Sequence, residues 1–176
     1  MTTITRNVYV DGQRIAVQAG DPSVTYSPRL CHTGGKPAML STEGNNSTPV
    51  VTETYLAEVY VPALVTITGV SLMNGASVAG NITVGLYTAA GVFLGKSDST
   101  AQAGTDVYQR IPLALTLVPG TYYVAAQFDS TSARFNTHIF GDFGAGKLTS
   151  QTYGTMPSAT MPTTFTTALG PIASLY

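Results

Sequence analysis

The chain has 176 residues and a formal net charge of −1, with 44% hydrophobic and only 10% charged residues. This length and hydrophobic content predict one globular domain, with room for an appended arm, and exclude a disordered chain. Lysines and arginines are scattered singly along the sequence. That distribution argues against a nucleic-acid partner, because phosphate contacts need clustered cations.

Cys31 is the single cysteine, so no disulfide can form within the chain, and a disulfide-stapled secreted scaffold is excluded. A structural zinc needs four Cys or His ligands, and one cysteine with two histidines cannot supply them, so we predict no metal. Residues 1–6 lack the basic and then apolar pattern of a signal peptide, and no apolar run is long enough to span a bilayer. We therefore expect synthesis in the host cytoplasm and no membrane partner.

Residues 1–49 are predicted to form a hairpin followed by an extended arm. Two short alternating pieces, residues 8–10 and 15–17, flank Asp11-Gly12, which is a strong signal for a tight hairpin turn. Gly- and Pro-rich sequence follows, and a disordered leader is the alternative interpretation. The segment is too short to bury its own apolar side chains. We therefore expect partner contacts at Val8, Tyr9, Tyr26, Leu30 and Met39.

Residues 50–176 are predicted to form an all-β domain, an antiparallel β-sandwich of the jelly-roll-like kind. Apolar and polar residues alternate, turn signals such as Asn74-Gly75 and Pro119-Gly120 recur at short intervals, and no stretch has a convincing helical period. Pro112 indicates either a sheet edge or a bulge. The predicted strands span residues 55–61, 64–72, 82–87, 92–96, 107–115, 121–128 and 134–140.

The tail, residues 143–176, is rich in Gly, Thr, Ser and Pro. Its prolines break it into short extended pieces. Its apolar residues are expected to close the sandwich or to pack on a partner; they are Phe165, Leu169, Ile172 and Leu175.

A glycine-rich stretch, residues 141–147, matches the first part of a phosphate-binding loop. Such a loop needs a Ser or Thr after its lysine and a helix behind it, whereas Leu148 follows here and Gly154 and Pro157 would interrupt a helix. We therefore expect a surface loop and no cofactor.

Two catalytic arrangements that the sequence could offer both lack support. Asp129, His138 and Asp142 with a nearby serine would resemble a hydrolase cluster, but no Gly-x-Ser-x-Gly elbow is present. Glu53 and Glu58 would have to face each other across a cleft to act as a glycosidase pair. We predict no catalytic residues.

The tyrosines are numerous enough to suggest a carbohydrate-binding platform as an alternative. Tryptophan, the usual sugar-stacking residue, is absent, and tyrosine is also common in strands and at protein interfaces.

The domain resembles the small β-sandwich proteins of tailed phages and prophages. The resemblance covers residues from about 50 to 176, as judged by the strand pattern, and implies a structural role in the particle with no catalytic residues. It rests on residues 54–62 (TYLAEVYVP), 66–70 (TITGV), 81–87 (NITVGLY), 119–125 (PGTYYVA), 162–165 (PTTF) and 170–176 (GPIASLY).

Together these features predict a non-enzymatic virion protein, a capsid cement or decoration protein on the outer capsid surface. Its expected partners are the major capsid protein and neighbouring copies of itself, with a trimer favoured, because closed rings bury sheet edges. The low charge fits extensive protein contacts, since interface cores are depleted of Lys, Glu and Asp. The alternative is a tail-fibre or receptor-binding module that recognises a host-surface glycan.

Overall fold

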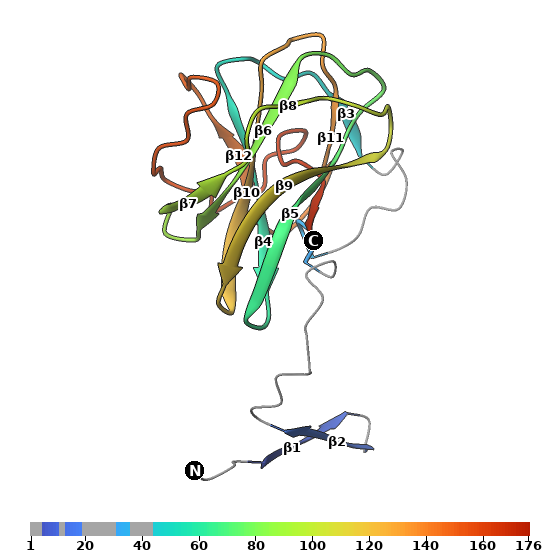
Figure 1. Cartoon of the computed structure of the whole chain (residues 1–176), viewed down its shortest axis with the longest axis vertical. Coiled ribbons are helices and arrows are strands. Elements are labelled where there is room, and N and C mark those ends of the chain that lie inside the picture. The colour runs from blue at the N-terminus through green and yellow to red at the C-terminus, as the bar shows by residue number, and fades with distance from the viewer. Residues whose placement is uncertain (1–4, 11–12, 19–30, 36–43) are drawn as a thin grey trace.

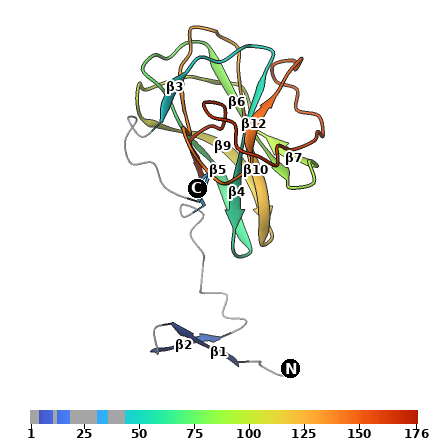
Figure 2. The same cartoon turned by 180° about the vertical axis from the view of Figure 1, so that it is seen from behind.

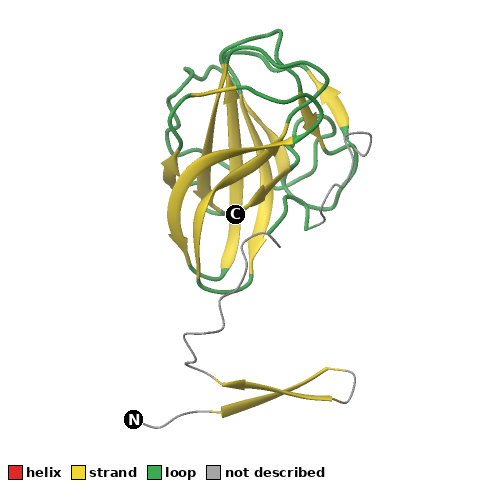
Figure 3. Ribbon diagram, turned by 45° about the vertical axis from the view of Figure 1, so that its right-hand side comes forward, coloured by secondary structure: helices red, strands yellow, loops and turns green. Residues whose placement is uncertain are grey.

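The computed structural model describes residues 5–10, 13–18, 31–35 and 44–176, and every regular element in this part is a β-strand (Figures 1 and 3). The predicted all-β class is therefore confirmed. The strands are β1 (Thr5–Val10), β2 (Gln13–Gln18), β3 (Asn45–Ser47), β4 (Thr54–Val61), β5 (Val65–Met73), β6 (Asn81–Thr88), β7 (Phe93–Lys96), β8 (Thr100–Ala101), β9 (Tyr108–Leu117), β10 (Gly120–Phe128), β11 (Phe135–Thr137), β12 (Ala145–Leu148) and β13 (Ala173–Leu175).

Two antiparallel sheets form the body of the protein. The larger sheet has the order β12-β4-β10-β6-β7, with β8 also paired to β6, and the smaller sheet has the order β13-β5-β9. The ribbon of β4 and β5 lies beside the ribbon of β9 and β10, because β4 pairs with β10 in one sheet and β5 with β9 in the other. This crossing of ribbons between two sheets is the jelly-roll-like arrangement that the turn signals predict.

The main core lies between the two sheets. Val124 and Phe128 enter it from β10, and Ile67 and Leu72 enter it from β5; all four are fully buried. Phe128 also packs on Phe135 of β11, with ring centroids 4.7 Å apart. Alternation with period two places Val124 and Phe128 on one face of β10. In β5 the register shift between Ile67 and Gly69 changes the phase of the alternation, so that Ile67 and Leu72 both face the core.

The other face of the larger sheet is buried as well. Tyr123, Ala125 and Gln127 alternate with the core residues of β10, and none is more than 5% exposed. Their cover is residues 151–164, called the strap below, which cross this face of the sheet (Figure 2). Met156 and Met161 of the strap pack in a second apolar cluster with the outward side chains of β4, β6 and β10.

Hydrogen bonds hold the strap along its length. Gln127 donates to the carbonyl of Thr155 (3.0 Å) and accepts from the amide of Gly154 (2.9 Å). The Ala159 amide donates to the carbonyl of Gly91 (3.0 Å). Gly91 has a positive φ of 80°, and a side chain there would collide with the Ala159 carbonyl. The turn at residue 91 and the contact between this turn and the strap therefore both require glycine.

Pro112 lies at a sheet edge and beside a bulge, so both predicted roles occur. Among the described residues β9 pairs with β5 alone, and the register between them shifts between Ile67 and Gly69, where Pro112 lies opposite Gly69. A side chain on Gly69 would collide with the carbonyl of Ile111 and the ring of Tyr176.

Several strand bounds differ from the sequence-based expectation. The strand predicted over residues 134–140 ends at Thr137, because the His138 amide donates to the carbonyl of Gly170 in the tail (2.9 Å) rather than to a strand. The tail contributes β12 and β13, which the Gly- and Pro-rich composition did not indicate.

The predicted N-terminal hairpin is present as β1 and β2, which pair antiparallel from Thr5↔Gln18 to Val10↔Gln13. Two segments on the N-terminal side of the predicted boundary at residue 50 belong to the sandwich. Residues 31–33 pair with β13, and β3 pairs with β11. The body of the sandwich therefore includes Cys31 and does not begin at residue 50.

A buried asparagine connects the loops at one end of the sandwich. Asn74 follows β5 and is fully buried. Its side-chain amide donates to the carbonyls of Ala103 (2.7 Å) and Gly104 (3.0 Å), and its oxygen accepts from Gln102 (3.1 Å). Its own carbonyl accepts from the side chain of Asn136 (2.7 Å).

Replacement of Asn74 by Ala is expected to lower the free energy of unfolding by about 3 kcal/mol, because buried donors and acceptors lose their partners. Urea denaturation at equilibrium measures this change. Asn45→Ala, at an exposed position, is the control and should stay within about 0.5 kcal/mol of the wild type. Equal stability of the two variants would contradict the assigned role of Asn74.

Candidate functional site

The structure leaves the predicted partner contacts as predictions. Val8 and Tyr9 lie in β1, paired with Ile15 and Arg14 of β2. Tyr26, Leu30 and Met39 lie outside the described residues.

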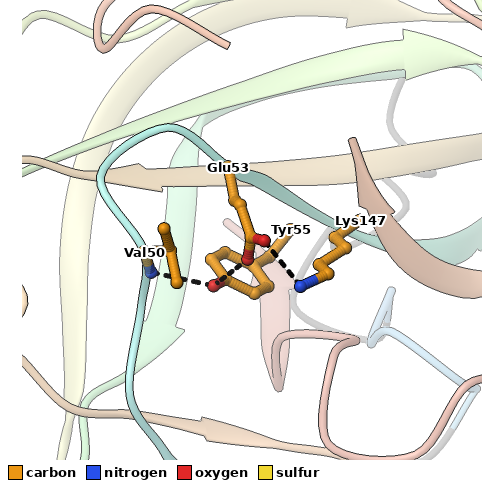
Figure 4. Close-up of polar contacts among 4 residues, drawn as sticks. All are labelled: Val50, Glu53, Tyr55 and Lys147. Atoms are coloured by element: carbon orange, nitrogen blue, oxygen red, sulfur yellow. Dashed lines mark hydrogen bonds and ion pairs between the residues drawn. The ribbon is translucent and has the colours of Figure 1, made fainter. Parts of the chain in front are cut away.

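The ionisable side chains of Glu53, Tyr55 and Lys147 contact one another (Figure 4). The Tyr55 hydroxyl donates to Glu53 Oε2 (2.6 Å) and accepts from the Val50 amide (2.9 Å). Lys147 Nζ lies 2.5 Å from Glu53 Oε1. Burial, followed by the hydrogen bond to Glu53, raises the pKa of Tyr55 well above its usual range.

This group stabilises the fold and offers no free acid or base. Both Glu53 oxygens and the Tyr55 proton are engaged, so the cluster ties the chain before β4 to β12. Lys147 is the lysine of the glycine-rich stretch; it lies in a strand, and its charge is paired with Glu53 rather than available to a phosphate.

The second acid near the start of the sandwich belongs to a separate network. Glu58 Oε2 accepts from the Gly144 amide (3.0 Å) and lies 3.5 Å from the Tyr123 hydroxyl, which donates to the carbonyl of Pro162 (2.7 Å). Tyr55 is in the main core, whereas Tyr123 is in the cluster under the strap. The partners of Glu53 and Glu58 therefore lie on opposite faces of the sheet, not across one cleft.

His138 contacts a hydroxyl but not an acid. Its Nε2 lies 2.9 Å from Thr33 Oγ1, which also accepts from the Ala173 amide (3.0 Å) and is fully buried. The ring packs edge-on against Phe143, with centroids 4.9 Å apart. Burial lowers the pKa of His138 to about 4, so the imidazole is neutral at pH 7 and joins the 31–35 segment to the body.

The other members of the imagined hydrolase cluster have different partners. Asp129 accepts from the backbone amide (2.6 Å) and the side chain (2.7 Å) of Asn81. Ser130 Oγ accepts from the Ser132 amide (3.2 Å), the pattern of a polar turn, and Asp142 is exposed in its loop.

Most tyrosines that suggested a sugar platform are inside the protein. Tyr55, Tyr87, Tyr122 and Tyr123 are all at most 6% exposed. Tyr60, by contrast, is 59% exposed. A stacking surface built from the four buried rings is therefore incompatible with the closed sandwich.

Sequence analysis missed an apolar surface formed by three exposed side chains, Tyr60, Leu64 and Val118, called the hairpin tip below. Their exposed fractions are 59%, 65% and 61%. Leu64 lies in the turn between β4 and β5, and Val118 lies in the turn between β9 and β10; these two turns are neighbours at one end of the sandwich (Figure 1). Tyr60 is the penultimate residue of β4, next to the first of these turns. The sequence signal that could have indicated these exposed residues is an apolar residue beside a turn proline, as at Pro62 and Leu64 or at Val118 and Pro119.

Comparison of the chain with protein-family models, curated proteins and solved structures gave no match. Within residues 5–10, 13–18, 31–35 and 44–176, no three His, Cys, Asp or Glu side chains are grouped as metal ligands. The same residues contain no helix that is long and apolar enough to cross a membrane.

Replacement of Tyr87 by Phe is expected to leave the free energy of unfolding unchanged or raise it by up to about 1 kcal/mol. The Tyr87 hydroxyl is buried without a hydrogen-bond partner among the described residues, and burial raises its pKa to about 12. Tyr122→Phe is the matched control, because it loses the bond to the carbonyl of Val118 (2.8 Å) and should cost about 1 kcal/mol. Urea denaturation distinguishes the two, and a larger loss for Tyr87→Phe would refute this expectation.

Stability is expected to fall as the pH drops from about 6.5 to about 4, because the folded state holds His138 neutral whereas the unfolded chain binds a proton at its ordinary pKa of 6.5. The loss is about 2 kcal/mol, since partial exposure of the ring reduces the effect. His138→Gln should flatten this part of the curve relative to the wild type, with pH 8 as the reference. Parallel curves for the two proteins in denaturation measurements across this range would show that another group is responsible.

Proposed function

We propose that the protein is a non-enzymatic structural protein of a phage virion, a cement or decoration protein that binds the outer capsid surface. Its N-terminal hairpin is the primary attachment element, and the sandwich is the body that covers the capsid or neighbouring copies. The sequence resemblance to small phage sandwich proteins is the reason for proposing a phage particle, and the isolated pairing of the hairpin supports the proposed mode of attachment.

The observation that carries this proposal is the isolated pairing of the hairpin. β1 and β2 form a sheet of their own, and among the described residues no third strand pairs with either. A two-stranded hairpin is marginally stable in water. It also has two free edges, and a partner sheet can extend such an edge by strand addition.

The body supports a structural role because its ionisable groups serve the fold. Glu53 is paired with Lys147 and Tyr55, and Glu58 is bound by the Gly144 amide. Each arrangement has a direct consequence for packing, and none places an activated nucleophile beside a base in an open site, which catalysis of hydrolysis would need.

The test is the copy number of the protein in phage particles purified from the strain that produces it, measured by quantitative mass spectrometry. Hundreds of copies per particle are expected for a lattice-decorating protein. A few copies, or a few tens, would replace the proposal with a tail or fibre role, and glycan recognition would then be measured. Absence from the particles would overturn the virion assignment.

The attachment role of the hairpin is tested with a matched pair of variants. Val8→Asp together with Ile15→Asp places two like charges directly opposite each other in the hairpin, which destabilises the pairing. Val8→Thr with Ile15→Thr keeps β-branched residues at the same positions and is the control. Loss of particle binding by the first variant alone is expected, and equal binding by both would exclude the hairpin as the attachment element.

A further inference from the structure

The strap contains the sequence Thr-Met-Pro twice, at residues 155–157 and 160–162. In both copies the threonine is exposed and the methionine is buried, with exposed fractions of 5% for Met156 and 6% for Met161. Both methionines belong to the apolar cluster on the covered face of the larger sheet. Two thioether side chains therefore anchor the strap to the sheet.

Met156 packs directly on a glycine of the larger sheet. Gly85 of β6 lies opposite Ala125 of β10, which in turn lies opposite Leu56 of β4. Sδ of Met156 occupies the space that a side chain on Gly85 would need. Because protein interiors are close-packed, an oxygen atom added to this sulfur would crowd the contact between strap and sheet.

Polarity makes a sulfoxide at either methionine unfavourable while the strap is docked. Oxidation converts the apolar thioether into a polar group, and a polar group that is buried among apolar side chains costs free energy. The neighbours in the cluster include Leu56 and Phe93. Water hydrates the sulfoxide once the side chain has left the cluster, so oxidation favours the undocked strap.

Both ends of the strap lie near the same strand, β12. The strap follows β12 in the chain, and the carbonyl of Thr164 at its other end accepts from the amide of Ala145 at the start of β12 (3.1 Å). A loop with neighbouring ends is an Ω-loop. The strap contains no strand, and single hydrogen bonds such as that from Ala159 to Gly91 hold it between its ends. Such a segment opens at a lower free energy than the sheet beneath it.

We propose that Met156 and Met161 form a reversible oxidation site that controls docking of the strap. Sulfoxides at these positions lift the strap and uncover the face of the larger sheet that carries Tyr87 and Tyr123. Reduction to the thioethers lets the strap dock again. The inference is independent of the capsid role proposed above.

The oxidant is a peroxide. One oxygen atom passes from hydrogen peroxide to the sulfur, so the O–O bond breaks, an S–O bond forms, the sulfur gives up two electrons and water is released. Methionine sulfoxide reductases catalyse the reverse step, with one enzyme for each sulfoxide epimer. Two thiols supply the electrons, become a disulfide and leave the oxygen as water.

The test treats the full-length protein with hydrogen peroxide and follows hydrogen exchange of the strap by mass spectrometry. The Gly154 amide donates to the side chain of Gln127, and the Ala159 amide donates to Gly91. Both bonds require a docked strap. Their exchange is expected to become about tenfold faster or more after oxidation, because burial of an unpaired polar group shifts the opening equilibrium by at least this factor. Amides of β10 are the internal reference and should keep their rates.

Peptide mass spectrometry of the same samples measures the sulfoxide at each methionine. Met73, the other methionine among the described residues, is 3% exposed and lies in β5, which pairs with β9 and β13. Its oxidation requires opening of a sheet, whereas that of the strap methionines requires opening of a loop. Met156 and Met161 should therefore be oxidised first. Treatment of the oxidised protein with both reductases and dithiothreitol should restore slow exchange of the strap.

The matched variant is Met156→Leu with Met161→Leu, which removes both sulfurs and keeps apolar side chains of similar volume. Circular dichroism and urea midpoints close to those of the wild type show that it is folded. Peroxide should leave its strap exchange unchanged. Met156→Leu alone and Met161→Leu alone are measured as well, and each should keep part of the response to peroxide.

Four results would overturn the proposal. One is the absence of sulfoxide at Met156 and Met161 under conditions that oxidise free methionine in the same tube. Another is sulfoxide formation with unchanged strap exchange, which would show that the cluster accommodates the new oxygen, with the Tyr87 hydroxyl as its donor. Equal acceleration in the double leucine variant would assign the effect to oxidation elsewhere. Failure of the reductases to restore slow exchange would refute reversible control.

Discussion

Strand β10 buries side chains on both of its faces, so the larger sheet needs cover on two sides. The smaller sheet covers one face and forms the main core, whereas the strap covers the other with its methionines. Burial of each large apolar side chain contributes about 1.5 to 3 kcal/mol. The strap therefore stabilises the sandwich as an added layer. Its attachment explains why Gln127, a polar residue of β10, is buried: its side-chain amide donates to the carbonyl of Thr155 and accepts from the amide of Gly154 in the strap.

The need to cover buried surfaces also explains why several polar side chains are buried and bonded to backbone groups. Where a loop or the strap crosses a buried surface, its backbone groups require partners, and several buried side chains supply them. Asn74 does so for the loop at Ala103, and Thr33, in the segment that enters beside β13, does so for the carbonyls of Pro171 and Ala173. Glu53 and Lys147 fix β12 at the edge of the larger sheet. In each of these places the polar side chains named here are engaged in holding the fold together.

The outer surfaces that distinguish this protein are the paired hairpin and the hairpin tip. Among the described residues, the hairpin strands pair only with each other, and the hairpin tip carries exposed apolar side chains. The low overall charge is consistent with them, because charged groups are costly to desolvate in an interface. The edge of β9 is less suited to strand addition than the edges of the hairpin. It contains Pro112, and a proline in an edge strand hinders pairing with a further strand. The proposed attachment through the hairpin, rather than through the edge of β9, takes this difference between the two edges into account.

The sequence by itself determined the all-β class, the hairpin around Asp11-Gly12 and the presence of either a sheet edge or a bulge at Pro112, because these depend on local alternation and turn chemistry. Only the tertiary structure decided which strands pair, that the strap covers the larger sheet, and that residues 31–33 belong to the body. Those arrangements depend on contacts between residues far apart in the chain, such as Thr33 with Ala173. Backbone pairing between distant segments leaves no periodic pattern in the local sequence from which it could be predicted. The tip was missed for the same reason: Leu64 and Val118 are ordinary turn neighbours until two ribbons bring them together.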